Sequence, residues 1–126
     1  MTYADAATDC AGRNGTLAMA ANSTTFGTLR DMFIDYQANK YTAGSSAVSA
    51  AWVDGINDPT NTGITGFYCA TLGAACPATM PWDTVSESEP DRTSLPNCAK
   101  VKASTDLTGL RDNRCSKAFV RICDLP

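Results

Sequence analysis

Apolar residues recur at helical spacing in the first 12 residues of the 126-residue chain. Thr2 and Asp5 have the spacing of an N-cap pair, and Gly12 is placed to end the helix that they begin. A first helix is therefore predicted over residues 2–12. Its apolar face would consist of Tyr3, Ala6, Ala7 and Cys10.

A second and clearer helical pattern begins after Ser23 or Thr24. The charged residues Arg30, Asp31 and Asp35 fall mostly outside its apolar stripe. This separation predicts a helix with one face buried in the core. The predicted buried face is Phe26, Leu29, Met32, Phe33 and Tyr36.

Helical periodicity stops after Asn39, and turn-forming residues become frequent. Short apolar runs predict strands over 48–56, 64–70, 98–102 and 118–123. The stretch 77–97 has no regular pattern, and a long irregular loop in a compact domain usually has a function. Two helices followed by short strands and long loops indicate the α+β class.

Composition describes a globular chain, with 44% apolar and 18% charged residues, and we expect one domain over residues 1–126. No apolar run is long enough to cross a membrane, and the net charge of -3 argues against nucleic acid as a partner. Histidine is absent, which excludes histidine-based triads and zinc sites. We therefore expect a binding protein and not an enzyme.

Six cysteines without a C-x-x-C spacing predict three disulfides and an oxidising compartment. Their spacing alone does not choose among the possible pairings. Sequons at Asn14 and Asn22 are compatible with secretion. No signal peptide is apparent, so we expect a mature, secreted form.

Several short motifs, taken in order, resemble those of the C-type lectin-like domains over about residues 2–124. They are Tyr3-x-x-Ala-x-x-x-Cys10, Asn14-Gly-Thr-Leu-Ala18, Ala51-Trp-Val-Asp-Gly-Ile-Asn-Asp58, Glu89-Pro-Asp91, Leu110-Arg-Asp112 before Cys115, and Ile122-Cys123. The resemblance implies disulfides Cys10–Cys123, Cys98–Cys115 and Cys69–Cys76. The strand that normally precedes the first helix in this family has no counterpart, and an unpaired edge would favour an oligomer.

In the family, the Glu-Pro-Asn triplet and the Asn-Asp of Trp-Asn-Asp bind calcium, which takes six to eight oxygen ligands. The resemblance makes Glu89, Asp91 and Asp112 the calcium ligands here, if calcium binds at all. Two other ligand positions are occupied by Pro96 and Arg111, which have no side-chain acceptor. No cofactor is therefore firmly implied, and a calcium site of the usual kind is not expected.

Arg111 could replace the metal by pairing with Glu89, Asp91 or Asp112 and by donating to sugar hydroxyls or an acetamido carbonyl. The predicted sugar-binding residues are Glu89, Asp91, Arg92, Arg111 and Asp112. Trp82 or Tyr68 could stack on a sugar ring, although burial is the simpler role for each. The function implied is a secreted, oligomeric lectin of innate immunity that binds cell-surface or microbial glycans. The alternative is a C-type lectin-like domain that binds a protein and no sugar.

Overall fold

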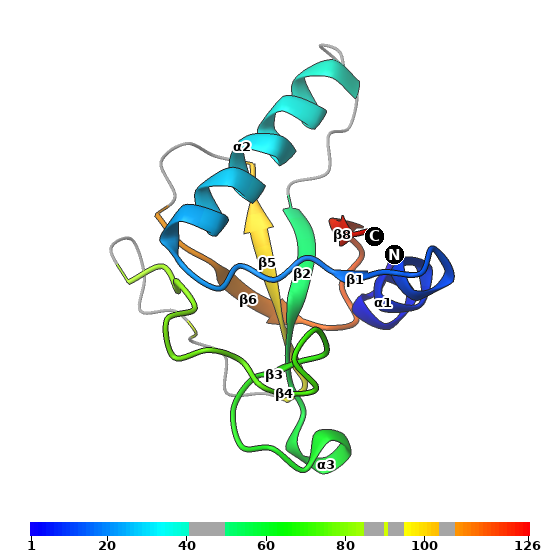
Figure 1. Cartoon of the computed structure of the whole chain (residues 1–126), viewed down its shortest axis with the longest axis vertical. Helices are drawn as coiled ribbons and strands as arrows, with labels where there is room; N and C mark the ends of the chain where they lie inside the picture. Colours follow the sequence, from blue (N-terminus) through cyan, green and yellow to red (C-terminus); the bar gives the residue numbers. More distant parts are fainter. Residues whose placement is uncertain (41–49, 85–89, 91–94, 104–107) are drawn as a thin grey trace.

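The structure is a computed structural model that describes residues 1–40, 50–84, 90, 95–103 and 108–126, with the side chains at 39 and 40 excepted. Two longer helices flank a central sheet (Figure 1). The described helices are α1 (Tyr3–Gly12), α2 (Ser23–Lys40) and the single turn α3 (Pro59–Thr62). The described strands are β1 (Thr16–Leu17), β2 (Ala50–Asn57), β3 (Tyr68–Cys69), β4 (Ala74–Ala75), β5 (Asn97–Lys102), β6 (Arg111–Arg114), β7 (Val120–Arg121) and β8 (Cys123–Asp124).

The first helix forms as its sequence predicts. Thr2 is the N-cap, and its hydroxyl accepts from the Asp5 N–H at 3.3 Å. The helix ends at Gly12, but the left-handed residue that turns the chain is Asn14, with φ 62°. The buried side chains on its apolar face are Tyr3, Ala6 and Cys10.

The second helix is confirmed, with one correction to its predicted buried face. Asn22 caps it, because the Asn22 Oδ1 atom accepts from the Thr25 N–H at 2.9 Å. The first half of the stripe is buried against the sheet (Phe26, Leu29 and Phe33). In the second half, Met32 is 54% and Tyr36 is 44% exposed. The reason is visible in Figure 1, where α2 extends past the end of the sheet.

The main sheet has the strand order β4-β3-β2-β5-β6 among the described residues, and every pairing along this order is antiparallel. In addition to these antiparallel pairings, β7 pairs with β2 in parallel. The register shifts between Trp52 and Ile56, where Gly55 has φ +151°. A side chain is strained in this conformation, so glycine suits the irregularity.

Two of the predicted strands are shorter in the structure. Residues 64–70 contribute only β3, and residues 118–123 divide between β7 and β8. After β2 the chain enters α3, with Asp58 as its N-cap. Three further described strands were not predicted, namely β1, β4 and β6.

The last segment of the chain has neighbours on both sides. β8 pairs antiparallel with β1, and the Ile122 N–H donates to the Trp52 carbonyl at 3.1 Å. On the other edge of this last segment, away from β1 and β2, Met1 and Phe119 exchange two hydrogen bonds of 2.9 Å. Main-chain hydrogen bonds therefore tie the last segment to β1, to β2 and to Met1.

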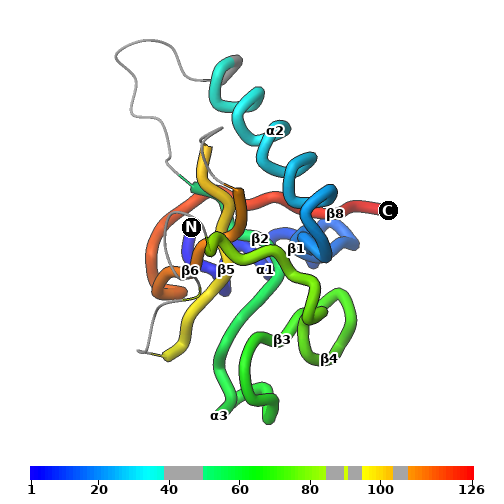
Figure 2. The backbone as a smooth tube through the Cα atoms, turned by 90° about the vertical axis from the view of Figure 1, so that its left-hand side faces the viewer, coloured from blue at the N-terminus to red at the C-terminus, as the bar shows by residue number. Residues whose placement is uncertain are grey.

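Three disulfides join the pairs that the resemblance implied, Cys10–Cys123, Cys69–Cys76 and Cys98–Cys115. The first ties α1 to β8, at the end of the chain, and Figure 2 shows these parts together from a second side. Trp52 lies at the centre of this region, 0% exposed, with its ring centroid 5.7 Å from Tyr3 and 4.8 Å from Phe119. No helix in the described ranges is both long and apolar enough to span a bilayer.

Candidate functional site

The candidate site lies where residues 80–84 run beside the beginning of β6. The Leu110 N–H donates to the Pro81 carbonyl at 2.7 Å, and the Asp83 N–H donates to the Leu110 carbonyl at 2.9 Å. Gly109 makes this approach possible, because a Cβ there would lie 2.5 Å from the Asp83 nitrogen. This main-chain pairing fixes the position of Asp83 relative to Arg111.

Asp83 holds the guanidinium of Arg111 in a partly buried ion pair. The Arg111 Nε and Nη2 atoms donate to the same Asp83 oxygen, at 3.3 and 3.2 Å. The other Asp83 oxygen accepts from the Thr108 hydroxyl at 3.3 Å. The Asp83 side chain is 0% exposed and that of Arg111 is 16% exposed. Such a pair has little screening by water, so the guanidinium is held in one position.

Asp112 follows Arg111 in β6 and is buried, with 4% exposure. It lies opposite Ala99 of β5, and Arg111 lies opposite Lys100. The Lys100 ammonium lies over the Phe119 ring, 5.1 Å from its centroid. The structure therefore places a buried carboxylate next to the fixed guanidinium in sequence, at the edge strand of the sheet.

Three of the predicted sugar-binding residues, Glu89, Asp91 and Arg92, lie outside the described residues. Of the five, the structure describes Arg111 and Asp112. Pro96, at the position where the family has a calcium ligand, is described and exposed.

The described residues do not fit a calcium site of the family's type. Within the described ranges, no three or more His, Cys, Asp or Glu side chains are grouped to hold a metal ion. At the position of a family ligand, the guanidinium of Arg111 is bound to Asp83. A cation held there opposes a second cation at the same place.

The two candidate stacking residues have protein partners. Trp82 is half-buried and packs on Phe67, with ring centroids 4.6 Å apart. Tyr68 is half-buried in β3, where it pairs with Ile56 and Ala75. The Trp82 ring is thus partly used by the scaffold, and Tyr68 is fixed in place by its strand.

Asp83 is the site residue that the sequence analysis missed. Its partner lies 28 positions away, and neither residue belongs to a periodic pattern that would bring them together. The available signal was indirect: Arg111 is a cation at a position where the family has a calcium ligand, and a cation that becomes buried needs a carboxylate partner.

This arrangement of helices and sheet is the C-type lectin-like fold. No family model matches the chain, and no curated protein matches its sequence. Solved structures do match. Human lithostathine superposes with a TM-score of 0.68 at 17% identity, over 98% of this chain and 76% of its own.

A C-type lectin named TC14, from the tunicate Polyandrocarpa misakiensis, superposes with a TM-score of 0.66 at 23% identity, over 100% of this chain and 92% of its own. A complex of SPL-1 with GlcNAc gives a TM-score of 0.66 at 14% identity, over 97% of this chain and 77% of that one. At these identities the similarity establishes the fold. The fold and the three disulfides are those expected from the sequence.

Proposed function

We propose that residues 1–126 act as one carbohydrate-recognition domain that binds glycans directly, without calcium. The observation that carries this proposal is the fixed guanidinium of Arg111, held by the buried carboxylate of Asp83. A guanidinium has five N–H donors, and its pair with Asp83 uses two of its nitrogens. The pair with Asp83 holds the guanidinium in the orientation that it would present to a ligand.

The proposed chemistry is complementary hydrogen bonding. Arg111, with Arg92 as a second donor, would donate to sugar hydroxyls or to the carbonyl of an N-acetyl group. Asp112, together with Glu89 and Asp91 of the long loop, would accept from hydroxyls. Fixing Arg111 in advance reduces the entropy that binding must overcome.

Two of the similar structures support a sugar ligand by their names, one as a C-type lectin and one as a complex with GlcNAc. A secreted location agrees with three disulfides in a small domain. We further propose that the domain acts as an oligomer in innate defence, because several weak sites acting together give useful avidity. The role is binding, not catalysis.

The test is a glycan array probed with calcium and again with chelator. We expect the same glycans to bind in both conditions. Arg111→Met should abolish binding, whereas Arg114→Met, at an exposed position of the same strand, should leave it unchanged. Binding that disappears on chelation would contradict the metal-free part of the proposal.

The second candidate function is recognition of a protein partner without sugar. It is favoured by the burial of the same residues, because Asp112 is 4% exposed and the Arg111 side chain 16% exposed. In that case Asp83 and Arg111 form a structural pair, and the loop surface contacts the partner. Cell agglutination that simple sugars inhibit would support the lectin. Absence of glycan binding in either condition would support the protein binder.

A further inference from the structure

The turn between α1 and β1 contains one of the two sequons of the chain, Asn14-Gly-Thr16. Asn14 is exposed and has a left-handed main chain, with φ 62°. Its N–H donates to the Ala11 carbonyl at 3.0 Å, and the Gly15 N–H donates to the Cys10 carbonyl at 2.9 Å. The end of α1 therefore fixes the main chain of the turn and leaves Asn14 on the surface.

The two sequons differ in how their Asn side chains are used. The Asn22 Oδ1 atom accepts from the Thr25 N–H at 2.9 Å and from the Thr25 hydroxyl at 3.1 Å, so capping of α2 accounts for this residue. The side-chain amide of Asn14 makes no hydrogen bond within the described part of the chain. A left-handed position accepts Gly and Asp as well as Asn, so the conformation of the turn does not require an amide there.

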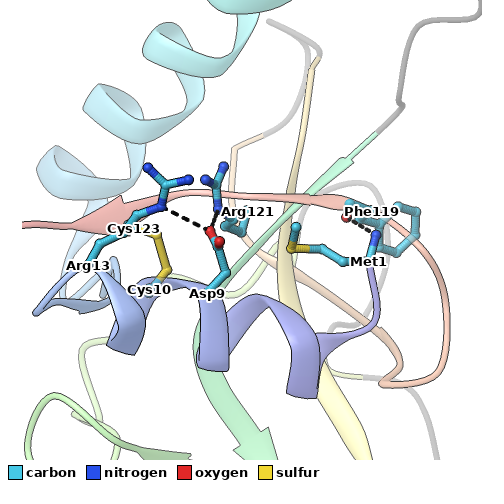
Figure 3. Close-up of polar contacts among 7 residues, drawn as sticks. All are labelled: Met1, Asp9, Cys10, Arg13, Phe119, Arg121 and Cys123. Carbon is cyan, nitrogen blue, oxygen red and sulfur yellow. Dashed lines mark hydrogen bonds and ion pairs between the residues drawn. A yellow bond between two sulfur atoms is a disulfide. The ribbon is translucent and has the colours of Figure 1, made fainter.

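The contacts that enclose this turn come from the far end of the chain. Thr16 pairs with Asp124, and the Cys10–Cys123 disulfide, with a sequence separation of 113 residues, lies at the end of α1 (Figure 3). Neither contact can form until nearly the whole chain has been made. The helix α1 has 10 residues, and a helix of this length is marginal without tertiary contacts. The sequon is therefore accessible while the chain is being synthesised.

We propose that Asn14 is an N-glycosylation site. Three disulfides in a small domain indicate an oxidising compartment, and in the secretory pathway the donor is a lipid-linked oligosaccharide diphosphate. A bond forms between the Asn14 Nδ2 atom and C1 of the first sugar, while the bond from C1 to the phosphate oxygen breaks. The lipid diphosphate leaves, and one Nδ2 proton passes to solvent. The sequon requires the Thr16 hydroxyl and excludes proline between, where this chain has Gly15.

A glycan at this turn would leave the candidate sugar site open. Figure 1 shows α1 and β6 on different sides of the molecule. Among the described strands, β6 ends the order of the main sheet, whereas Thr16 belongs to the separate pair of β1 and β8. The modification is therefore independent of the proposed sugar binding, and failure of either proposal leaves the other standing.

The test is secretion of the chain from insect cells behind a heterologous signal peptide. Peptide-N-glycosidase in heavy-oxygen water then labels each Asn that carried a glycan, and mass spectrometry locates the label. Trypsin releases residues 14–30 as one peptide that contains both sequons, so the parent chain carries Thr24→Ala, at an exposed position, to remove the second. We expect the label at position 14 in most secreted molecules. Unlabelled Asn14 in protein with its three disulfides intact would overturn the proposal.

Thr16→Ser and Thr16→Val form the matched pair of variants in this parent chain. Serine keeps the hydroxyl of the sequon, whereas valine keeps the β-branched shape that suits β1 and has no hydroxyl. We expect the label in Thr16→Ser and none in Thr16→Val. Asn14→Asp tests folding, because Asp also tolerates the left-handed conformation, and this variant should be secreted without a glycan. Label that persists at Asn14 in Thr16→Val would reject the sequon mechanism.

Discussion

Removing the guanidinium of Arg111 is the most direct test of the site's construction. In Arg111→Met, the carboxylate of Asp83 stays 0% exposed but loses two hydrogen bonds, of 3.3 and 3.2 Å. Breaking a buried pair from one side costs about 3–5 kcal/mol. We expect a loss of about 3 kcal/mol, the lower end, because the Thr108 hydroxyl still donates to Asp83.

Removing the other partner should cost less. In Asp83→Asn the remaining guanidinium is 16% exposed, and the amide oxygen can still accept from it. We therefore expect a loss of about 1–2 kcal/mol. The double variant should lose less than the sum of the two single losses, because the second change no longer breaks an intact pair.

The measurement is urea unfolding of the disulfide-intact protein, with thermal unfolding as a second probe. About 3 kcal/mol corresponds to a fall in Tm of roughly 10 °C for a chain of this length. The control is Arg114→Met, an exposed position of the same strand that should change stability by at most about 0.5 kcal/mol. If Arg111→Met costs no more than this control, the ion pair does not stabilise the site as argued.

Three further predictions concern the scaffold. Asp54→Ala should cost about 2–4 kcal/mol in urea unfolding, because the buried carboxylate accepts from the Ala70 and Thr71 N–H groups, both at 2.9 Å, and both would lose their acceptor. Asp58→Ala, at a half-buried position, is the comparison, and equal losses would contradict this. Replacing the Cys10–Cys123 pair by alanines should lower the free energy of unfolding by about 5 kcal/mol, and replacing Cys69–Cys76 should lower it by about 2.5 kcal/mol. The difference arises because the two disulfides close loops with separations of 113 and 7 residues. A larger loss for the short loop would refute the loop-entropy argument. The hydrogen bond from Arg121 lowers the pKa of Asp9 below its ordinary value of 3.8, so its contribution to stability is present above about pH 4 and is lost as the pH falls through the lowered pKa. The Tm of Asp9→Asn should therefore fall less steeply than that of the unmodified chain as the pH is lowered. Parallel plots of Tm against pH would exclude this role for Asp9.

Most of the scaffold can be predicted from the sequence, because its helices and central strand depend on local and periodic patterns. The cap at Thr2 and the apolar face of α1 follow from spacing, and the strand core around Trp52 follows from a buried apolar run. The exposure of Met32 and Tyr36 could not be predicted in this way. Periodicity identifies a helical face, but the length of sheet beneath that face depends on strands elsewhere in the chain. Two-residue strands such as β1 and β4 are too short to show an alternating pattern at all.

The site shows the same division between local and distant information. Arg111 is recognisable from the sequence as a cation in place of a ligand, whereas its partner Asp83 is set by main-chain pairing between two irregular segments and by the close approach that Gly109 permits. The pair therefore has a consequence beyond stability. A guanidinium anchored from beneath by a buried carboxylate keeps its orientation when the ligand is absent, which is the condition for a donor that binds without reorganising. If Arg111 recognises a glycan, Asp83→Asn should weaken binding through a faster dissociation rate even where the folded fraction is unchanged, because the donor would be present but no longer held.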